Sequence, residues 1–413
     1  MSSTPLRPAP HRSTPATAPV RPRDRRGRRS TVVAATGLAL LLSACSTGGG
    51  SQDDAKGGEK KPAAKPEISV NLTGRAAAPG KPVTVKLAEG ELKDVKVAGA
   101  KGAPLGGTVS KDGGTWTSQR AAAPGTSYTV EATTKDGGSA RAAFATAAAG
   151  KVNKLEMTPS KGSTVGIAQP VSIVFDHPVK NKAAVERSLK ITTSNDTTGS
   201  WGWIDHYDGR SRIDWRPKEY WRTGTEVRLQ AELNGVDSGT AGGWFVRDYD
   251  LSFTIGAPQV VKVDLGTKRL KLVRGGETLR SIPMSAGTPG GVKRSWGGTS
   301  VLMAKEGTIN MNSETVGLGD AYDKMVDHSM RLTWSGMYAH AAPWNTAHFG
   351  NANRSSGCIG MSDGDASWLY SQVRPGDPFE ISGPGHKGNP APGNGYGEWN
   401  LSWDDWRAKS ALA

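Results

Sequence analysis

Short runs of alternating apolar and polar residues dominate the chain from residue 67 to residue 149. Residues 83–87 (VTVKL) and 128–132 (YTVEA) place every second side chain on one face, which is typical of half-buried β-strands. The Asp-Gly-Gly sequences at 112–114 and 136–138 accept positive φ and therefore predict turns between strands. Because no long stretch has helical periodicity, the segment is predicted to form one β-sandwich, immunoglobulin-like in size.

The same alternation continues through a second segment, residues 150–256. Residues 171–175 (VSIVF), 227–231 (VRLQA) and 253–255 (FTI) predict further strands. Packing in a core or an interface is expected for the Trp residues of this segment, and stacking on carbohydrate is the alternative. These residues are Trp201, Trp203, Trp215, Trp221 and Trp244. Neither segment contains a cluster of His, Cys or acidic residues, so both are predicted to be spacers.

A third segment, residues 257–382, also begins with strand patterns, at 260–265 and 270–273, and a Gly-containing turn follows at 274–277. A chain of 413 residues is long enough for several such domains. Its composition, with 36% hydrophobic residues, 54 Gly and 25 Pro, excludes a membrane protein with many spans. The sequence therefore predicts a mainly β, multidomain protein.

The positive charge is concentrated at the N-terminus. The formal net charge is +14, but residues 1–44 contain eight Arg and one Asp, and the remainder of the chain carries +7. A nucleic-acid-binding surface gathers its cations on one face, and no dense basic run follows residue 44. Nucleic acid is therefore not predicted as a partner.

Residues 31–42 form an uncharged, mostly apolar stretch behind the Arg cluster. The stretch is too short to span a bilayer but has the length of the apolar region of a signal peptide. It ends in Leu42-Ser43-Ala44-Cys45, which resembles the lipobox of bacterial lipoproteins. In that family the Cys receives a diacylglycerol, and cleavage makes it the new N-terminus.

The resemblance implies a lipoprotein signal peptide over residues 1–44 and a lipid on Cys45. It also implies a location on the outer face of the cytoplasmic membrane, facing the cell wall. The alternative is a plain signal peptide with an incidental Cys. Residues 45–66 contain no large apolar side chain after Cys45 and are predicted to be a flexible tether.

The second cysteine, Cys358, lies in the sequence SSGCIGM at 355–361, and His340 precedes it by 18 residues. A lone thiol can be buried and inert, but in an oxidising compartment an idle, exposed thiol would be oxidised. A thiol nucleophile needs a base, and imidazole has a suitable pKa. Gly357 allows a backbone turn in which successive N–H groups face a developing oxyanion. The spacing predicts a nucleophilic Cys/His site.

Two cysteines exclude a disulfide-rich scaffold and a Cys-based structural zinc site. The sequence contains no His-x-x-x-His pair, so a metal site is not predicted either. No cofactor is expected.

Together these residues resemble the L,D-transpeptidase catalytic domain of bacterial peptidoglycan-crosslinking enzymes. The signature of that family is a His followed, after a variable loop, by S-H-G-C-[IVL]-[NR]. The tail GEWNLSWDDWR at 397–407 is similar to the end of actinobacterial members. The resemblance implies two immunoglobulin-like β-sandwich modules at 67–149 and 150–256, followed by a mixed β-sandwich catalytic domain at 257–382. A short Trp-rich helical piece would occupy 383–413.

The resemblance also implies an acyltransferase that forms 3-3 crosslinks between peptidoglycan tetrapeptide stems, through a Cys thioester and with release of D-alanine. Cys358 would be the nucleophile and His340 the general base and acid. The backbone carbonyl of Ala341 would orient His340, and the N–H groups of Gly357 and Cys358 would form the oxyanion hole. Carbapenem-type β-lactams are expected as covalent inhibitors.

A lid is expected from about residue 307 to residue 331. Within it, Met311 and Tyr322 correspond to residues that line the channel for the donor stem, although both could be ordinary core residues. Asp327 and His328 could add polar lining. Trp344 and Ser356 are also expected to contact substrate.

Two positions depart from the signature. Ser356 stands where the family usually has His, and Gly360 stands where it usually has Arg or Asn. The same Cys/His pair could also serve an L,D-carboxypeptidase, a cysteine peptidase in which water replaces the acceptor amine. A catalytically lapsed wall-binding lipoprotein is the third alternative.

The C-terminal Trp residues allow two interpretations. Trp399, Trp403 and Trp406 share one face if the whole stretch is helical, whereas a shorter helix capped by Ser402 aligns only the last two. They could bind sugar as an aromatic strip. Docking against the second module is expected instead, because so short a helix needs tertiary burial.

Overall fold

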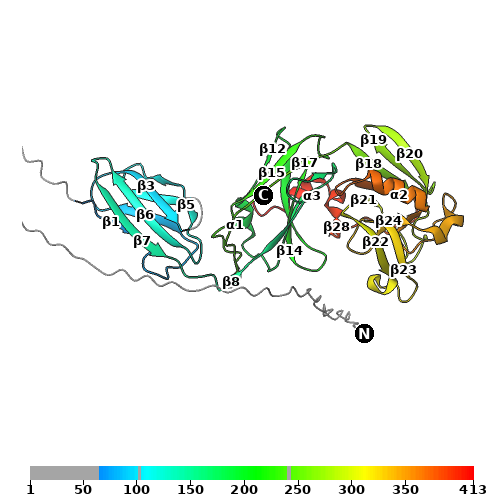
Figure 1. Cartoon of the computed structure of the whole chain (residues 1–413), viewed down its shortest axis with the longest axis horizontal. Coiled ribbons are helices and arrows are strands. Elements are labelled where there is room, and N and C mark those ends of the chain that lie inside the picture. The colour runs from blue at the N-terminus through cyan, green and yellow to red at the C-terminus, as the bar shows by residue number, and fades with distance from the viewer. Residues whose placement is uncertain (1–64, 101–103, 240–242) are drawn as a thin grey trace, which may run out of the picture. The chain divides into compact units, whose positions relative to one another are not determined.

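The computed structural model describes residues 65–100, 104–239 and 243–413, and strands are its main elements (Figure 1). The predicted lipobox at residues 42–45 and most of the tether lie outside these residues. The prediction of a mainly β fold is confirmed. Within the described ranges, none of the helices combines the length and the apolar character needed to cross a membrane.

The first module is a sandwich of two sheets with strand orders β1-β2-β5-β4 and β3-β6-β7. Along β6 every second residue is buried, as the alternation predicts. Gly113 and Gly137 have φ of 75° and 90° in the turns expected at the Asp-Gly-Gly sequences. The strands are β1 (Ile68–Val70), β2 (Pro82–Leu87), β3 (Leu92–Gly99), β4 (Gly107–Val109), β5 (Thr115–Ala121), β6 (Ser127–Thr134) and β7 (Ser139–Ala145).

The second module pairs a sheet of order β13-β14-β11-β9 with one of order β10-β17-β15-β12. Its elements are β8 (Lys151–Val152), β9 (Leu155–Thr158), β10 (Thr164–Val165), β11 (Val171–Phe175), α1 (Lys182–Arg187), β12 (Leu189–Thr193), β13 (Gly199–Asp205), β14 (Ser211–Pro217), β15 (Glu226–Ala231), β16 (Gly243–Trp244) and β17 (Tyr249–Ile255). Four of its Trp residues are buried in the core between the sheets, as expected for packing: Trp201, Trp203, Trp215 and Trp221.

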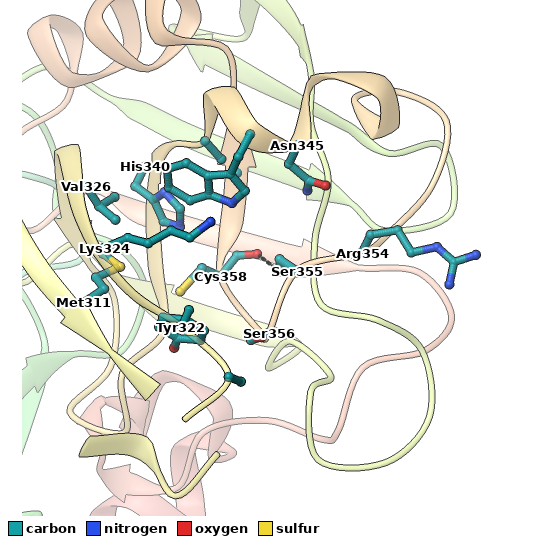
Figure 2. A pocket seen from close by; sticks show the side chains of 14 residues that line it. Met311, Tyr322, Lys324, Val326, His340, Asn345, Arg354, Ser355, Ser356 and Cys358 are labelled. Carbon is teal, nitrogen blue, oxygen red and sulfur yellow. Dashed lines mark hydrogen bonds between the residues drawn. The ribbon is translucent and has the colours of Figure 1, made fainter. Parts of the chain in front are cut away.

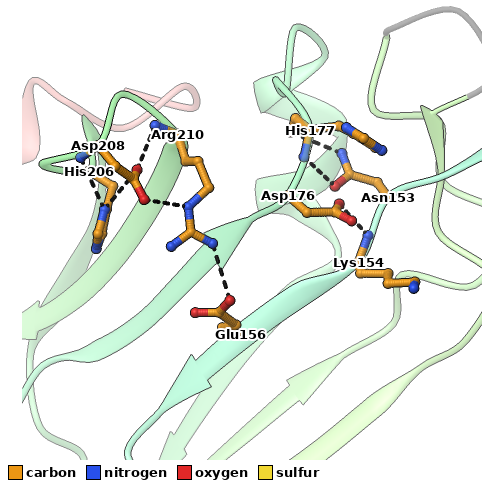
Figure 3. A network of polar contacts seen from close by, with 8 residues as sticks. All are labelled: Asn153, Lys154, Glu156, Asp176, His177, His206, Asp208 and Arg210. Carbon is orange, nitrogen blue, oxygen red and sulfur yellow. Dashed lines mark hydrogen bonds and ion pairs between the residues drawn. The ribbon is translucent and has the colours of Figure 1, made fainter. Parts of the chain in front are cut away.

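Polar contacts hold edge strand β9 to this sheet (Figure 3). Arg210, just before β14, donates to Asp208 at 2.8 Å and to Glu156 of β9 at 3.2 Å. At the start of β9, the backbone N–H of Lys154 donates to the carboxylate of Asp176 at 2.6 Å. Exposed pairs of this kind add little free energy, so they fix the position of the edge strand more than they stabilise the fold.

The third domain, predicted at residues 257–382, contains two sheets around one apolar core. The first has the order β20-β19-β18-β26-β21, and the second has the order β22-β23-β24-β25. Parallel pairs (β18 with β26, β24 with β25) occur beside antiparallel ones, so the domain is a mixed β-structure. The first sheet comprises β18 (Gln259–Asp264), β19 (Arg269–Arg274), β20 (Glu277–Pro283), β21 (Gly298–Val301) and β26 (Pro378–Ser382). The second comprises β22 (Ala304–Asn312), β23 (Asp323–Arg331), β24 (Tyr338–Ala341) and β25 (Ile359–Met361), with helices η1 (Ser313–Val316), η2 (Pro343–His348) and α2 (Asp363–Gln372).

The C-terminal piece contains β27 (Pro392–Gly393), β28 (Gly395–Tyr396), η3 (Gly397–Asn400) and α3 (Trp403–Arg407). Leu401 is extended, and the Ser402 hydroxyl accepts a hydrogen bond from the backbone N–H of Asp405. The shorter, Ser402-capped helix is therefore the correct interpretation. A single helix over the whole stretch is wrong, because the chain breaks at Leu401.

The Trp residues of this piece dock on the second module. Trp406 is fully buried, and its indole N–H donates to the carbonyl of Ser200 at 3.0 Å. A Cβ at Gly202 would lie 2.6 Å from the Trp406 ring, so glycine is needed for this contact. Trp399 donates to the carbonyl of Ala168 at 2.8 Å. These contacts agree with the expectation of docking.

Candidate active site

Parallel pairing of β24 with β25 brings His340 and Cys358 together. In this pairing His340 of β24 is in register with Gly360 of β25, and Cys358 lies directly before β25. The loop between the two strands contains η2, so an 18-residue separation in sequence closes into one site. Figure 2 shows both side chains beside Met311 and Tyr322 of the lid.

Cys358 follows a turn that is stabilised by Ser355. The hydroxyl of Ser355 donates to the carbonyl of Cys358 at 2.6 Å and accepts from the N–H of Gly357 at 3.2 Å. Gly357 has φ of 125°, a conformation that L side chains rarely adopt, which explains why glycine precedes the cysteine. The N–H of Gly357, which is predicted to face the oxyanion, donates to the hydroxyl of Ser355 in this structure.

His340 is held by the residue that follows it. Its Nδ1 lies 2.6 Å from the carbonyl oxygen of Ala341, which can only accept, so Nδ1 carries the proton and Nε2 is left as an acceptor. This is the arrangement that the resemblance implies for Ala341. Burial lowers the pKa of His340, and the bond to Ala341 acts in the opposite direction. The imidazole is therefore neutral near pH 7, as a general base must be.

The thiol of Cys358 is protonated in this arrangement. Burial raises its pKa to about 11, opposed by a backbone hydrogen bond from Tyr338 and by the positive charge of Lys387. The sulfur donates weakly to the carbonyl of Gly336 at 3.5 Å. Because its pKa is raised, the thiol of Cys358 is protonated at neutral pH, so it needs a base to take its proton if it is to act as a nucleophile.

The two side chains open into a pocket with an empty volume of about 750 Å³. All four residues expected to contact substrate line it: Met311, Tyr322, Trp344 and Ser356. Its other lining residues are Ala321, Lys324, Val326, His340, Ala342, Asn345, Arg354, Ser355, Cys358 and Gly360. Asp327 and His328, suggested above as lining, are not among them.

The lid is a hairpin of β22 and β23, joined across residues 313–322 by η1 and a loop. On β23, Lys324 lies with its Nζ 4.7 Å from the centre of the Trp344 ring, which stacks on His340 with 6.0 Å between ring centres. The cation–π contact joins the lid to η2 beside His340. Sequence reasoning missed Lys324, because nothing in its local pattern distinguishes it from other exposed lysines.

Close packing explains why residue 360 is a glycine in this chain. A Cβ at this position would lie 2.9 Å from the Cβ of Ala342, which also lines the pocket. A larger side chain would require η2 or β25 to move. The departure from the family signature thus accompanies tight packing between β25 and the segment after β24.

Among the described residues, no group of three or more His, Cys, Asp or Glu side chains is placed to hold a metal ion. The arrangement places a thiol and an imidazole, groups that can act as nucleophile and base, in the lining of one pocket. It can therefore perform acyl transfer through a thioester.

Comparison with known proteins places this site in a family. Residues 258–381 match the L,D-transpeptidase catalytic domain, and residues 74–237 match the bacterial Ig domain, a range that includes parts of both sandwiches. L,D-transpeptidase 2 of Mycobacterium tuberculosis is 33% identical over 344 residues, which cover 80% of this chain and 81% of that protein. L,D-transpeptidase 5 of the same species is 31% identical over 361 residues, covering 86% and 79%.

A solved structure of an L,D-transpeptidase in complex with imipenem is 32% identical, with a TM-score of 0.47, and covers 55% of this chain and 97% of that chain. The segment that matches the L,D-transpeptidase catalytic domain, residues 258–381, contains both His340 and Cys358. The chain therefore belongs to the L,D-transpeptidase family, the enzymes that crosslink bacterial peptidoglycan.

Proposed function

We propose that this protein forms 3-3 crosslinks between peptidoglycan tetrapeptide stems through a thioester on Cys358, with release of the terminal D-alanine. The observation that carries the proposal is the buried His340, fixed by the Ala341 carbonyl in the pocket that also contains Cys358. Its Nε2 is the acceptor that a thiol proton requires.

In the first half-reaction, the sulfur of Cys358 attacks the carbonyl carbon of the third stem residue. The thiol proton passes to Nε2 of His340, a C–S bond forms, and the carbonyl electrons move onto oxygen. When the tetrahedral intermediate collapses, the C–N bond to D-alanine breaks, and the imidazolium gives its proton to the departing amine. The product is a thioester and free D-alanine.

In the second half-reaction, the side-chain amine of another stem attacks the thioester carbon. The amine gives a proton to His340, the C–S bond breaks, and the proton returns to sulfur. One amide is broken and another formed, so no cofactor or external energy source is needed.

The oxyanion needs a donor that is available in the intermediate. The N–H of Cys358 is our candidate, because the N–H of Gly357 donates to Ser355. Loss of one such donor costs about 3–4 kcal/mol in comparable sites. Gly357 would contribute only if its bond to Ser355 were exchanged for one to the substrate.

Product analysis tests the proposal. Purified protein is incubated with disaccharide-tetrapeptide, with Cys358→Ala as the control, and the products are separated by mass. A crosslinked dimer with stoichiometric D-alanine supports the proposal, and a free tripeptide would indicate the carboxypeptidase instead. Intact mass after treatment with imipenem provides a second arm. A carbapenem adduct on Cys358 is expected, and an unlabelled protein without turnover would indicate a lapsed wall-binding protein.

The proposal includes an anchor at the outer face of the cytoplasmic membrane, through a diacylglycerol on Cys45. It is supported by the residues of the lipobox alone. One acyl chain binds membranes only marginally, so two chains are needed for firm retention. In membrane fractionation of the full chain, Cys45→Ala should move from the membrane to the soluble fraction. Unchanged retention would contradict the anchor.

A further inference from the structure

A second, smaller pocket lies beside the catalytic turn. It has an empty volume of about 380 Å³ and shares Tyr322 and Ser356 with the pocket of Cys358. Gly357 also lines it, whereas His340 does not. The second pocket is therefore next to the catalytic turn but away from the base.

Two cations line this pocket, Arg294 and Lys387, and none of its lining residues is acidic. Both are half-buried, and within the described residues neither forms an ion pair with a carboxylate. Each positive charge disfavours the other: the charge of Arg294 contributes, after burial, to a lowered pKa of Lys387. Unpaired like charges in a partly desolvated pocket are unfavourable unless an anion joins them.

Polar and cation–π contacts restrain both side chains. The guanidinium of Arg294 donates through Nε to the carbonyl of Gly291 at 2.9 Å and through Nη1 to that of His386 at 3.4 Å. Lys387 lies with its Nζ 4.3 Å from the centre of the Trp296 ring, and its backbone N–H donates to the carbonyl of Ser295 at 2.9 Å. The two segments that carry the cations are thus tied to each other.

The same segments are tied to the catalytic turn. The hydroxyl of Ser295 donates to the carbonyl of Gly357 at 2.8 Å, one residue before the nucleophile. The charge of Lys387 also acts on the thiol of Cys358, opposing the effect of burial on its pKa. An anion held by the two cations would therefore lie at a defined position relative to the sulfur of Cys358.

The chemistry of the reaction indicates which part of the stem reaches this pocket. The amine that leaves, and later the amine that attacks, must exchange a proton with His340, so both occupy the first pocket. The acyl part of the donor can extend from the attacked carbonyl past Tyr322, which lines both pockets, toward Ser356 and Gly357. Stem peptides carry free carboxylates on this acyl part: the α-carboxylate of the γ-linked glutamate at the second position, and in some stems one on the diamino acid at the third.

We propose that Arg294 and Lys387 bind a free carboxylate of the acyl-donor stem. They would thereby select donor stems in which this carboxylate is free over stems in which it is amidated. The inference rests on the proposed function and assigns it a substrate-binding pair. Nη2 of Arg294 and the second N–H of its Nη1 remain to donate two parallel hydrogen bonds to a carboxylate, and the ammonium of Lys387 adds a point charge. Amidation of the bound carboxylate would remove its charge and leave the two cations unpaired.

The test compares three synthetic tetrapeptide stems as donors: one with free carboxylates, one amidated at the second residue, and one amidated at the third. The measurement is kcat/KM for release of D-alanine by the full protein. Amidation of the bound carboxylate should lower kcat/KM about 10- to 100-fold, which is the range for loss of a hydrogen bond to a charged group. The stem whose kcat/KM falls identifies which carboxylate is bound.

The double variant Arg294→Gln/Lys387→Gln should lose a similar factor on the free stem and should no longer distinguish it from the amidated one. Lys293→Gln is the matched control, because it removes an exposed cation next to Arg294 that does not line the pocket. It should retain the wild-type preference.

Equal rates of the wild-type protein on all three stems would overturn the inference and leave the proposed function intact. A double variant that still discriminates against amidation would also overturn it. If no stem acylates Cys358 of the wild-type protein, the proposed function fails and the inference fails with it.

Discussion

Nδ1 of His340 lies 2.6 Å from the carbonyl oxygen of Ala341, the next residue in the chain. A main-chain acceptor thus takes the orienting role that a carboxylate has in many catalytic triads. The neutral carbonyl fixes the tautomer, and it raises the pKa of the imidazole by less than burial lowers it. The burial of His340 can therefore keep the base neutral and ready to accept a proton.

If Cys358 and His340 act as proposed, removal of either side chain should abolish or strongly reduce turnover. Cys358→Ser should leave no measurable D-alanine release, because a hydroxyl ionises far less readily than a thiol. His340→Ala should lower kcat at least about 100-fold, the lower limit for loss of a general base. His348→Ala is the matched control, since His348 does not line the pocket, and it should stay near the wild-type rate. Near-native rates of His340→Ala across neutral pH would assign the base to another residue.

Alkylation of Cys358 should be slow at neutral pH and should rise steeply toward alkaline pH. Burial raises the pKa of the thiol to about 11, and the thiolate fraction grows about tenfold per pH unit below that value. The rate constant for modification by iodoacetamide, followed by intact mass, measures this fraction. A plateau reached near the ordinary pKa of a cysteine would show that the folded protein stabilises the thiolate.

The contact between Lys324 and Trp344 should contribute to substrate binding through the position of the lid. The ammonium lies 4.7 Å from the ring centre, and cation–π contacts at exposed sites are worth about 0.5–1 kcal/mol. Lys324→Met should therefore raise KM about two- to fivefold with little change in kcat. Lys324→Arg, which keeps a cation over the ring, should restore KM. A tenfold loss in kcat with unchanged KM would contradict a role limited to the lid.

Glu398 should make the stability of the protein depend on pH. The Glu398 side chain is fully buried near Asp214, which forms an ion pair with Arg212 at 2.5 Å. Burial and, to a smaller extent, the negative charge of Asp214 raise the pKa of Glu398 well above its usual value. The folded state then binds a proton that the unfolded chain has lost, so stability falls as pH rises above the ordinary pKa of glutamate.

Glu398→Gln removes this titration and retains the shape of the side chain. The melting temperature of the wild-type protein should fall from about pH 5 to pH 8, and that of Glu398→Gln should fall less. Asp404→Asn, which changes an exposed carboxylate of α3, should follow the wild-type curve. Parallel curves for wild type and Glu398→Gln would show that the carboxylate is ionised in the folded protein.

Local patterns in the sequence determined the strands and the position of the chemistry. Alternation at residues 83–87, 128–132 and 227–231 predicts strands that are present, because a half-buried strand needs one apolar face whatever its neighbours are. The Gly357-Cys358 pair and His340 also stand out in the sequence. Cysteine and histidine are rare in this chain, and a glycine directly before a cysteine indicates a turn at a reactive side chain. In both cases the information lies within a few residues of the feature.

The tertiary structure alone decided which residues share a site and which interactions are already satisfied. Lys324, Arg294 and Lys387 come from the lid, from the loop before β21 and from the segment after β26, and no local pattern distinguishes them. Sequence reasoning assigned the Gly357 N–H to the oxyanion hole, yet the bond to the Ser355 hydroxyl depends on the conformation of the turn. The protonated thiol likewise results from burial by segments far apart in the chain. Strand patterns follow from the chain's own neighbours, whereas electrostatics and hydrogen bonds depend on every segment that packs around a group.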